Sequence, residues 1–571
     1  MQIDHVVVLM LENNSFDRML GWMPGVDGVD LANPRSNLNL AGTAVAQKTT
    51  VTRQMKSDPA HDLSDVLAQM AGPGMAEQNT GFVKNFQLHY AESVAADWAE
   101  AMNYYGKGSL PVLHVLAQAF VVCDRWFSSM PGPTWPNRFF VNSGTSLGHV
   151  DMPEGIFHPN LHLYNQETVY DRLQDAGKNW AIYYGDVPQT LTMTHMLKYP
   201  SNFHKMPQFF TDASGAEASF PSYSFIEPNY FGGGQNDEHP PSDILRGEVL
   251  LAQVYNAIRN NEALWEKTLL VVLYDEHGGF YDHVFPPACV APDGNTSKFS
   301  FAQYGLRVPA ILISPWLEKQ VLSDDLDHTS LLRYVTDMWG LGPLGARTAA
   351  AKSFASTWKV AGAVRTDVPV NIPEPTTLPN PVVEGLNPNQ LALVGFSRYL
   401  ETQTMAMAET QGPAAAKAMT MEIGQRVLWS SAEDRHGEAA VERVDRFFEL
   451  ARQTAPAGAG AGRAKKKATE KTPVKAAAAK ASSKKASLKK ASAKKASLKK
   501  ASLKKESGTK GAAKKVSKVS AKKKTVLAAR KTSRERGKVN PLLKIAAKGI
   551  AKAAAKKALA RAVKKSATRP R

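Results

Sequence analysis

Short runs of β-branched and apolar residues recur through the first 340 positions and alternate with segments of helical spacing. The predicted buried strands are Ile3–Leu11, Phe120–Cys123, Trp180–Tyr184, Ser222–Ile226, Thr268–Tyr274 and Val308–Ile313. The predicted helices between them include Leu63–Met70, Leu110–Ala119, Ile244–Asn260 and Thr329–Trp339. Alternation of this kind favours a mainly parallel sheet covered by helices. The sequence therefore predicts an α/β fold for this part of the chain.

The charge of the chain is divided between two parts that differ in sign. Of the 70 Lys and Arg residues, 39 lie in residues 461–571, together with only 3 of the 52 Asp and Glu residues. This tail carries a net charge of +36, whereas residues 1–460 carry −18. A basic character that suits nucleic acid or membrane partners is thus expected of the tail alone.

The C-terminal part of the chain changes composition in steps. Residues 366–388 are rich in Pro, Val, Asn and Thr, which suits an extended connector, and helical patterns follow at Gln390–Thr410, Ala414–Trp429 and Gly437–Arg452. We therefore expect a catalytic body at 1–365, a connector at 366–388, a helical appendage at 389–454, a disordered tail rich in Lys, Ala and Ser at 455–539, and a basic amphipathic helix at 540–571.

Several classes of protein are excluded by what the sequence lacks. Only two cysteines occur, Cys123 and Cys289, which excludes a disulfide framework and a zinc site built from cysteines. The first residues show no basic region followed by a cleavable apolar segment, and no run approaches the roughly 18 apolar residues of a membrane span. We therefore expect a cytoplasmic protein without a transmembrane segment, with export by another route as the alternative.

Two groups of polar residues follow predicted buried strands directly. Glu12 and Asn13 come after the first strand, and Asp275 and Glu276 come after the fifth. In open α/β sheets ligands collect outside the carboxyl ends of the strands, and carboxylate and amide oxygens bind hard cations. The alternative for the first group is a helix cap, and the alternative for the second is a solvated loop with a surface carboxylate pair.

Thr134 precedes Trp135 and Pro136 at the start of an apparent helix. A threonine N-cap with proline in the first turn is good capping chemistry, so a purely structural role is one interpretation. The same position aims a hydroxyl and free backbone N–H groups at one point, which suits a phosphoryl group about to be attacked. His61 and His239 lie in polar loops that contain proline, where a solvated surface histidine is the ordinary alternative.

In combination, these segments resemble the bacterial phospholipase C and acid phosphatase family, a phosphoesterase family related to the alkaline phosphatases. The matching segments are Ile3–Leu20, Pro131–Thr145, Asn236–Glu248, Thr268–Pro287 and Gly305–Val335. The resemblance implies an alkaline-phosphatase-like fold. It also implies one hydroxyl nucleophile that attacks phosphorus and is activated by a bound metal.

The resemblance assigns roles residue by residue. Thr134 matches the nucleophile, while His61 and His239 match histidines that bind phosphoryl oxygens or protonate the leaving group. The residues that match the metal ligands are Glu12, Asn13, Thr134, Asp275 and Glu276. The candidate substrate-binding residues are Trp135, Asn137, Arg138 and His328.

The expected cofactor is one divalent metal ion. Ligands that bind through oxygen favour Mg²⁺, Ca²⁺ or Mn²⁺, with zinc or iron as alternatives. Trp135 stands where members that act on phospholipids often have an acidic residue. Its indole either covers a quaternary ammonium head group or packs in the core.

The expected function is phosphodiester hydrolysis of the phospholipase C type through a covalent phosphothreonine, with a phospholipid as one candidate substrate. An acid phosphatase acting on phosphomonoesters is the alternative enzyme. The alternative from another class is a catalytically inactive protein that binds polyanions through its tail. That tail resembles bacterial histone-like tails and suits nucleic acid, polyphosphate or an anionic membrane surface, contacted by residues such as Lys489, Lys490, Lys499 and Lys500.

Overall fold

The structure is a computed structural model that describes residues 2–71, 78–90, 92–93, 95–153, 164–381, 385–413, 415 and 437–454. The chain divides into two units, Met1–Lys466 and Lys467–Arg571, and every described residue lies in the first. Several predictions concern residues outside the described part. They are the disordered tail at 455–539, the terminal helix at 540–571, the lysines Lys489, Lys490, Lys499 and Lys500, and nearly all of the helix expected at Ala414–Trp429.

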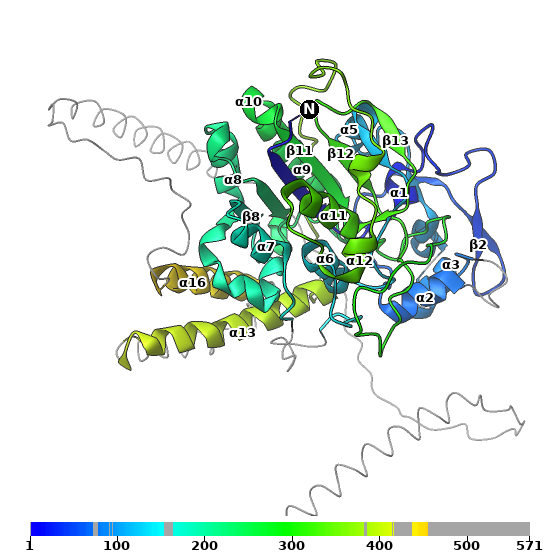
Figure 1. Cartoon of the computed structure of the whole chain (residues 1–571). Coiled ribbons are helices and arrows are strands. Elements are labelled where there is room, and N and C mark those ends of the chain that lie inside the picture. The colour runs from blue at the N-terminus through cyan, green and yellow to red at the C-terminus, as the bar shows by residue number, and fades with distance from the viewer. Residues whose placement is uncertain are drawn as a thin grey trace, which may run out of the picture. The chain divides into compact units, whose positions relative to one another are not determined.

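An eight-stranded sheet forms the centre of the body (Figure 1). Across the sheet its strands are β13 (Gln320–Leu322), β6 (Val121–Cys123), β12 (Ala310–Ile313), β11 (Thr268–Tyr274), β1 (His5–Leu11), β10 (Tyr223–Glu227), β8 (Trp180–Tyr184) and β9 (Phe203–Lys205). All neighbouring strands pair in parallel except β12, which is antiparallel to both β11 and β6. The predicted α/β class with a mainly parallel sheet is confirmed.

All six predicted strands are present, and their bounds lie within two residues of the predicted ones. The central strands β1 and β11 are buried along their whole length, which is why they appear in the sequence as continuous apolar runs. Two further strands of the sheet, β9 and β13, are not among the predicted ones. Both are three-residue strands at the edges of the sheet and are only partly buried, so they carry no apolar run.

Helices pack around the sheet, and α6 contacts both α7 and α11, while α9 contacts α8 and α10. The longer helices of the body are α2 (Leu63–Ala71), α3 (Phe82–His89), α5 (Leu113–Ala119), α6 (Thr134–Ser143), α7 (Val169–Asp175), α8 (Met206–Ala213), α9 (Leu245–Arg259) and α11 (His328–Trp339). The shorter ones are α1 (Phe16–Leu20), α4 (Ala95–Ala99), α10 (Glu262–Trp265) and α12 (Gly345–Ala350). Small two-stranded pairs are β14 (Leu326–Asp327) with β7 (Trp126–Phe127), β2 (Ser36–Leu38) with β3 (Ala44–Ala46), and β4 (Thr49–Thr50) with β5 (Tyr104–Tyr105).

Two C-terminal helices, α13 (Pro388–Thr410) and α16 (Glu438–Thr454), pack on each other (Figure 1). The ring of Phe448 on α16 lies 5.6 Å from that of Tyr184 on β8 and 5.2 Å from that of Phe203 on β9. Most buried apolar residues of both helices belong to the same core as the sheet. In the described part of the chain, no helix combines the length and the apolarity that a membrane span requires.

The buried guanidinium of Arg307 ties together the segments that follow β1 and β11. Its Nε donates to Asp282 Oδ1 at 2.8 Å, and its Nη2 donates to Asp17 Oδ1 at 3.0 Å. Its Nη1 donates to two backbone carbonyl groups, at 2.7 and 2.6 Å. Asp17 lies on α1 and Asp282 follows β11, so one arginine fixes the two loops that leave the centre of the sheet.

We expect Arg307→Ala to lower the free energy of unfolding by about 3–5 kcal/mol, because two buried carboxylates lose their counter-charge. The measurement is urea unfolding with the m-value fitted. The matched control is Arg125→Ala, which removes a partly exposed ion pair with Asp325 (Nε to Oδ1, 2.6 Å) and is expected to cost less than about 1 kcal/mol. Equal losses in the two variants would contradict a central role for Arg307.

Candidate active site

The register of β1 and β11 places two of the predicted metal ligands side by side. The strands pair in parallel with Leu11 beside Tyr274, so the next residues, Glu12 and Asp275, leave the sheet together at its carboxyl edge. Their side chains are fully buried. Asn13, which follows Glu12, is buried as well, so polar groups are concentrated at a point where the surrounding core excludes water.

Three buried oxygens of this group have no hydrogen-bond partner among the described residues: Glu12 Oε2, Asn13 Oδ1 and Glu276 Oε1. Buried oxygens of this kind are costly unless a cation or a donor meets them. Asp275 differs, since its Oδ1 accepts from the backbone N–H groups of Asn13 (3.2 Å) and Glu276 (2.7 Å). Unpaired carboxylate and amide oxygens are the ligands that a hard divalent cation takes, so the residues present fit a metal ion.

Glycine is required where the loop that follows β1 meets the loop that follows β11. Gly278 has a φ of 64°, and a Cβ built on it would lie 2.3 Å from the carbonyl oxygen of Asn13. Any larger residue would push the loop that carries Glu276 away from the loop that carries Glu12. The chain therefore turns tightly after β11, and the close approach of the two loops depends on this turn.

Arg138 lies between two carboxylates of this group, while its Nη1 has no hydrogen-bond partner among the described residues, so its contact with substrate stays a prediction. Its Nε is 3.0 Å from Asp275 Oδ2 and its Nη2 is 3.4 Å from Glu12 Oε1, with all three side chains buried. Burial raises the pKa of Glu12 well above its usual range and that of Asp275 to about 6, although Arg138 acts in the opposite direction. The arginine thus offsets part of the negative charge gathered at the edge of the sheet.

Thr134 is the first residue of α6, so the expectation that it caps this helix is wrong by one position. The N-cap is Pro133, which is extended, and Thr134 already has helical geometry. The side chain of Thr134 is almost fully buried. Arg138 lies four residues further along α6, hence on the same face of the helix, and contacts Glu12 and Asp275. The face of α6 that carries Thr134 is therefore the face that meets the acidic group.

The side-chain polar groups of Trp135 and Asn137 form hydrogen bonds within the protein. The indole Nε1 of Trp135 donates to Asn389 Oδ1 at 2.9 Å, and its ring packs edge-on against Tyr164 at 5.9 Å. This contact favours the core interpretation of Trp135 over a cover for a head group. Asn137 bonds only to backbone groups of residues 130–133, so it fixes the loop before Thr134.

Both ring nitrogens of His328, another predicted substrate-binding residue, have partners within the protein. Its Nε2 is 2.7 Å from the backbone carbonyl oxygen of Asp275, and the indole Nε1 of Trp126 lies 3.3 Å from its Nδ1. Burial lowers the pKa of His328 to about 4, so the ring is neutral at pH 7. The neutral ring donates from Nε2 to the carbonyl of Asp275 and accepts at Nδ1, which holds the end of β11.

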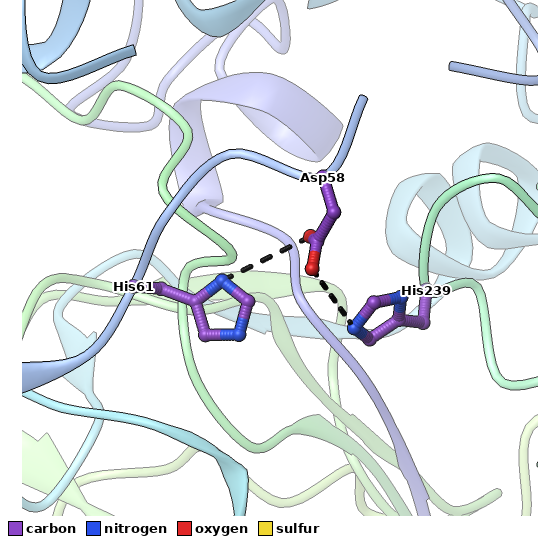
Figure 2. Close-up of side chains that lie close together, drawn as sticks. All are labelled: Asp58, His61 and His239. Carbon is purple, nitrogen blue, oxygen red and sulfur yellow. Dashed lines mark ion pairs between the residues drawn. The ribbon is translucent and has the colours of Figure 1, made fainter. Parts of the chain in front are cut away.

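His61 and His239 lie on two sides of the carboxylate of Asp58 (Figure 2). His61 Nδ1 is 3.9 Å from Asp58 Oδ1, and His239 Nε2 is 3.5 Å from Asp58 Oδ2. Each ring places its Nδ1 against a backbone carbonyl oxygen, that of Pro59 (2.7 Å) or that of Pro240 (2.6 Å). A carbonyl oxygen only accepts, so Nδ1 carries a proton in both rings and Nε2 is left for chemistry.

His61 connects this histidine pair with the acidic group. Its Nε2 is 3.4 Å from Asn13 Nδ2 and 3.9 Å from Glu276 Oε1. Burial by itself lowers the pKa of His61, but the carboxylates of Glu276 and Asp58 raise it to about 9. His61 is therefore a cation at pH 7, which suits a group that binds negatively charged phosphoryl oxygens.

Two residues that contact the site, Asp58 and Asn389, are not among the predicted site residues. Asp58 stands three residues before His61 in Asp-Pro-Ala-His, and this carboxylate-to-histidine spacing is the signal that could have identified it. Asn389 has no such signal, because it lies beyond every segment that resembles the family.

Among the described residues, two groups of acidic residues and histidines have potential metal-ligand atoms within 4.8 Å of one another. They are Asp58, His61 and His239, and Asp17, Asp282 and His283, of which the second is already neutralised by Arg307.

Comparison with known proteins identifies the family. Residues 3–342 match the model described as the Phosphoesterase family, and this is more than half of the chain. The chain belongs to this family, which confirms the predicted resemblance and makes it a phosphoric ester hydrolase.

Named relatives specify the type of phosphoesterase. Non-specific phospholipase C6 of Arabidopsis thaliana is 37% identical over 408 residues, which cover 65% of this chain and 75% of the relative. Phospholipase C A of Mycobacterium tuberculosis is 28% identical over 397 residues, or 59% of this chain and 73% of the relative. Among solved structures, a protein in the alkaline phosphatase superfamily from Vibrio parahaemolyticus is 12% identical, with a TM-score of 0.27, and the match covers 44% of this chain and 66% of that one. The sequence relatives make this chain a phosphoesterase of phospholipase C type.

Divalent cations are expected to stabilise the folded protein through Glu276 and Glu12. At a cation concentration about 100 times the dissociation constant, the free energy of unfolding rises by about 2.7 kcal/mol relative to protein in EDTA. Glu276→Gln removes one charged ligand, so most of this gain should disappear. Urea unfolding with Mn²⁺ or EDTA measures it, and Glu318→Gln, at an exposed carboxylate, is the control that should keep the full gain. An undiminished gain in Glu276→Gln would argue against the site.

Proposed function

We propose that this chain hydrolyses phosphodiesters, phospholipids among them, with one divalent metal ion and Thr134 as the nucleophile. The observation that carries this proposal is the paired register of β1 and β11, which sets Glu12 beside Asp275, with unpartnered buried oxygens in the same group. The phospholipases C among the relatives support a phospholipid as the substrate class. Glu12, Asn13, Thr134, Asp275 and Glu276 are the residues that would hold the metal.

Thr134 needs activation, because a threonine hydroxyl is a poor nucleophile at neutral pH. A divalent cation supplies Lewis-acid stabilisation of negative charge on oxygen when it is bound in such a site. The protein contributes the N-terminus of α6, whose positive end favours an anionic oxygen on Thr134 and a phosphoryl group beside it. Thr134 first loses its hydroxyl proton to solvent, and in-line attack by Oγ1 then forms the Thr134 Oγ1–P bond as the bond from phosphorus to the leaving alcohol oxygen breaks.

The two histidines divide the remaining tasks. The cationic ring of His61 binds non-bridging phosphoryl oxygens as negative charge builds up on them. His239 presents Nε2 as the proton donor to the leaving oxygen, with Nδ1 fixed by the carbonyl of Pro240. A water then attacks the phosphothreonine and gives its proton to His239, which restores Thr134 and releases a phosphomonoester.

Thr134→Ala is expected to lower the turnover of p-nitrophenyl phosphorylcholine by about 10³-fold or more, because the covalent step is lost. Thr134→Ser keeps a hydroxyl and should retain part of the activity. Rapid quenching followed by mass spectrometry should find a phosphorylcholine ester on Thr134 in the wild type.

The matched control is Ser143→Ala at the other end of α6, where the hydroxyl bonds to the backbone and activity should be kept. Full activity of Thr134→Ala at normal metal content would refute the mechanism. A wild type that prefers p-nitrophenyl phosphate to the diester would change the assignment to an acid phosphatase.

His239→Ala and His61→Ala should respond differently to the leaving group. Loss of a general acid slows the release of a poor leaving alkoxide, such as that of a diacylglycerol, far more than the release of p-nitrophenolate. His61→Ala should slow both substrates by a similar factor, because it acts on phosphoryl oxygens common to both. Steady-state rates on phosphatidylcholine and p-nitrophenyl phosphorylcholine provide the comparison.

His89→Ala, at a half-exposed surface histidine, is the control for that comparison and should leave both rates unchanged. An equal loss on both substrates in His239→Ala would remove His239 from the acid role.

A further inference from the structure

The first turn of α13 contacts the candidate active site, although α13 lies outside the part of the chain that matches the family model. That match ends at residue 342, and α13 begins at Pro388. Asn389, on this turn, is almost fully buried and donates from Nδ2 to Glu12 Oε1 at 2.8 Å. Asn387, the N-cap, places its Nδ2 3.3 Å from Nδ1 of His239. Residues 387–389 therefore contact both a proposed metal ligand and the proposed acid.

The orientation of the Asn389 side chain is fixed by Trp135. An indole N–H only donates, so the 2.9 Å contact from Trp135 Nε1 identifies the opposite atom as Asn389 Oδ1. The amide nitrogen must then face Glu12. Trp135 stands directly after the proposed nucleophile, so one side chain joins the start of α6, the end of β1 and the start of α13.

This contact decides which oxygen of Glu12 is free. Oε1 accepts from Asn389 and also lies 3.4 Å from Arg138 Nη2, while Oε2 has no partner among the described residues. A carboxylate held by one oxygen presents the other in a defined direction. Partners of this kind orient the ligands of metal sites and raise their affinity.

The position of Asn389 is itself well supported. α13 starts with a capping box, in which Asn387 Oδ1 accepts from the backbone N–H of Gln390 (2.7 Å) and the Gln390 side chain accepts from the backbone N–H of Asn387 (3.0 Å). Gln390 Nε2 in turn donates to the carbonyl oxygen of Tyr230, just after β10, at 2.6 Å. The first turn of α13 is thus anchored to the same edge of the sheet that carries the acidic group.

We propose that Asn389 is a positioning residue that presents Glu12 to the divalent cation, so that the start of α13 is part of the active site. This inference rests on the proposed function, because it takes Glu12 as a metal ligand. A merely structural Asn389 would affect the stability of α13 and leave the metal affinity as it is. The two roles therefore differ in a measurable quantity other than activity.

The test uses the full chain and Mn²⁺ as the probe, with affinity measured by electron paramagnetic resonance of the free ion. Asn389→Ala is expected to weaken Mn²⁺ binding by about 10–100-fold. Asn389→Asp keeps the acceptor for Trp135 but removes the amide that donates to Glu12 Oε1, so Glu12 loses its orienting partner and Mn²⁺ binding should weaken. The control is Thr404→Val, which removes a buried hydroxyl bonded within α13 to Leu400 and should leave Mn²⁺ affinity unchanged.

The outcomes separate this inference from the proposed function. Weakened Mn²⁺ binding in both Asn389 variants supports the positioning role, even if the wild type shows no diester turnover, which would count against the proposed function alone. Affinity within twofold of the wild type in either folded variant overturns the role of Asn389. A wild type that binds no Mn²⁺ overturns it as well. Circular dichroism confirms that each variant is folded, and Asn389→Asp provides the result if Asn389→Ala does not fold.

Discussion

Buried carboxylates are concentrated at the ends of β1 and β11, and the surrounding structure has to compensate their charge. Glu12, Asp275 and Glu276 are removed from water, and each ionised carboxylate is expensive in such a place without a counter-charge. The protein supplies two cations, the guanidinium of Arg138 and the protonated ring of His61. If all three carboxylates are ionised, two cations leave net negative charge beside oxygens that have no hydrogen-bond partner among the described residues, and a divalent cation would relieve this condition.

The scaffold brings these charges together with few elements. The register of two central strands sets Glu12 beside Asp275, and α6 carries both Arg138 and, one turn earlier, Thr134. The proposed nucleophile and the counter-charge are therefore fixed relative to each other by one helix. Arg307 connects the loops that follow the same two strands, so the distance between these loops does not depend on the charged groups of the site alone.

The sequence predicted the parts of this arrangement that are local. Buried strands stand out as apolar runs, and polar residues directly after them mark the carboxyl edge, so Glu12 and Asp275 could be found from the chain alone. The ion pairs of Arg138 could not be predicted, because its position four residues after Thr134 does not reveal which carboxylates it will contact. The same holds for Trp135, which was expected either to cover a head group or to pack in the core. The choice depended on the residue that contacts its indole, and that residue, Asn389, lies more than 250 residues away in the sequence.

The contact between α13 and Glu12 shows that the limits of a family match need not be the limits of a site. Residues 3–342 contain every group assigned to the chemistry, yet one oxygen of Glu12 is held by a residue beyond them. α13 and α16 share the core of the sheet, so their packing energy and the orientation of Glu12 are linked. A substitution that loosens the helix pair would therefore act on the proposed metal site through Asn389, without changing any group proposed to contact the substrate.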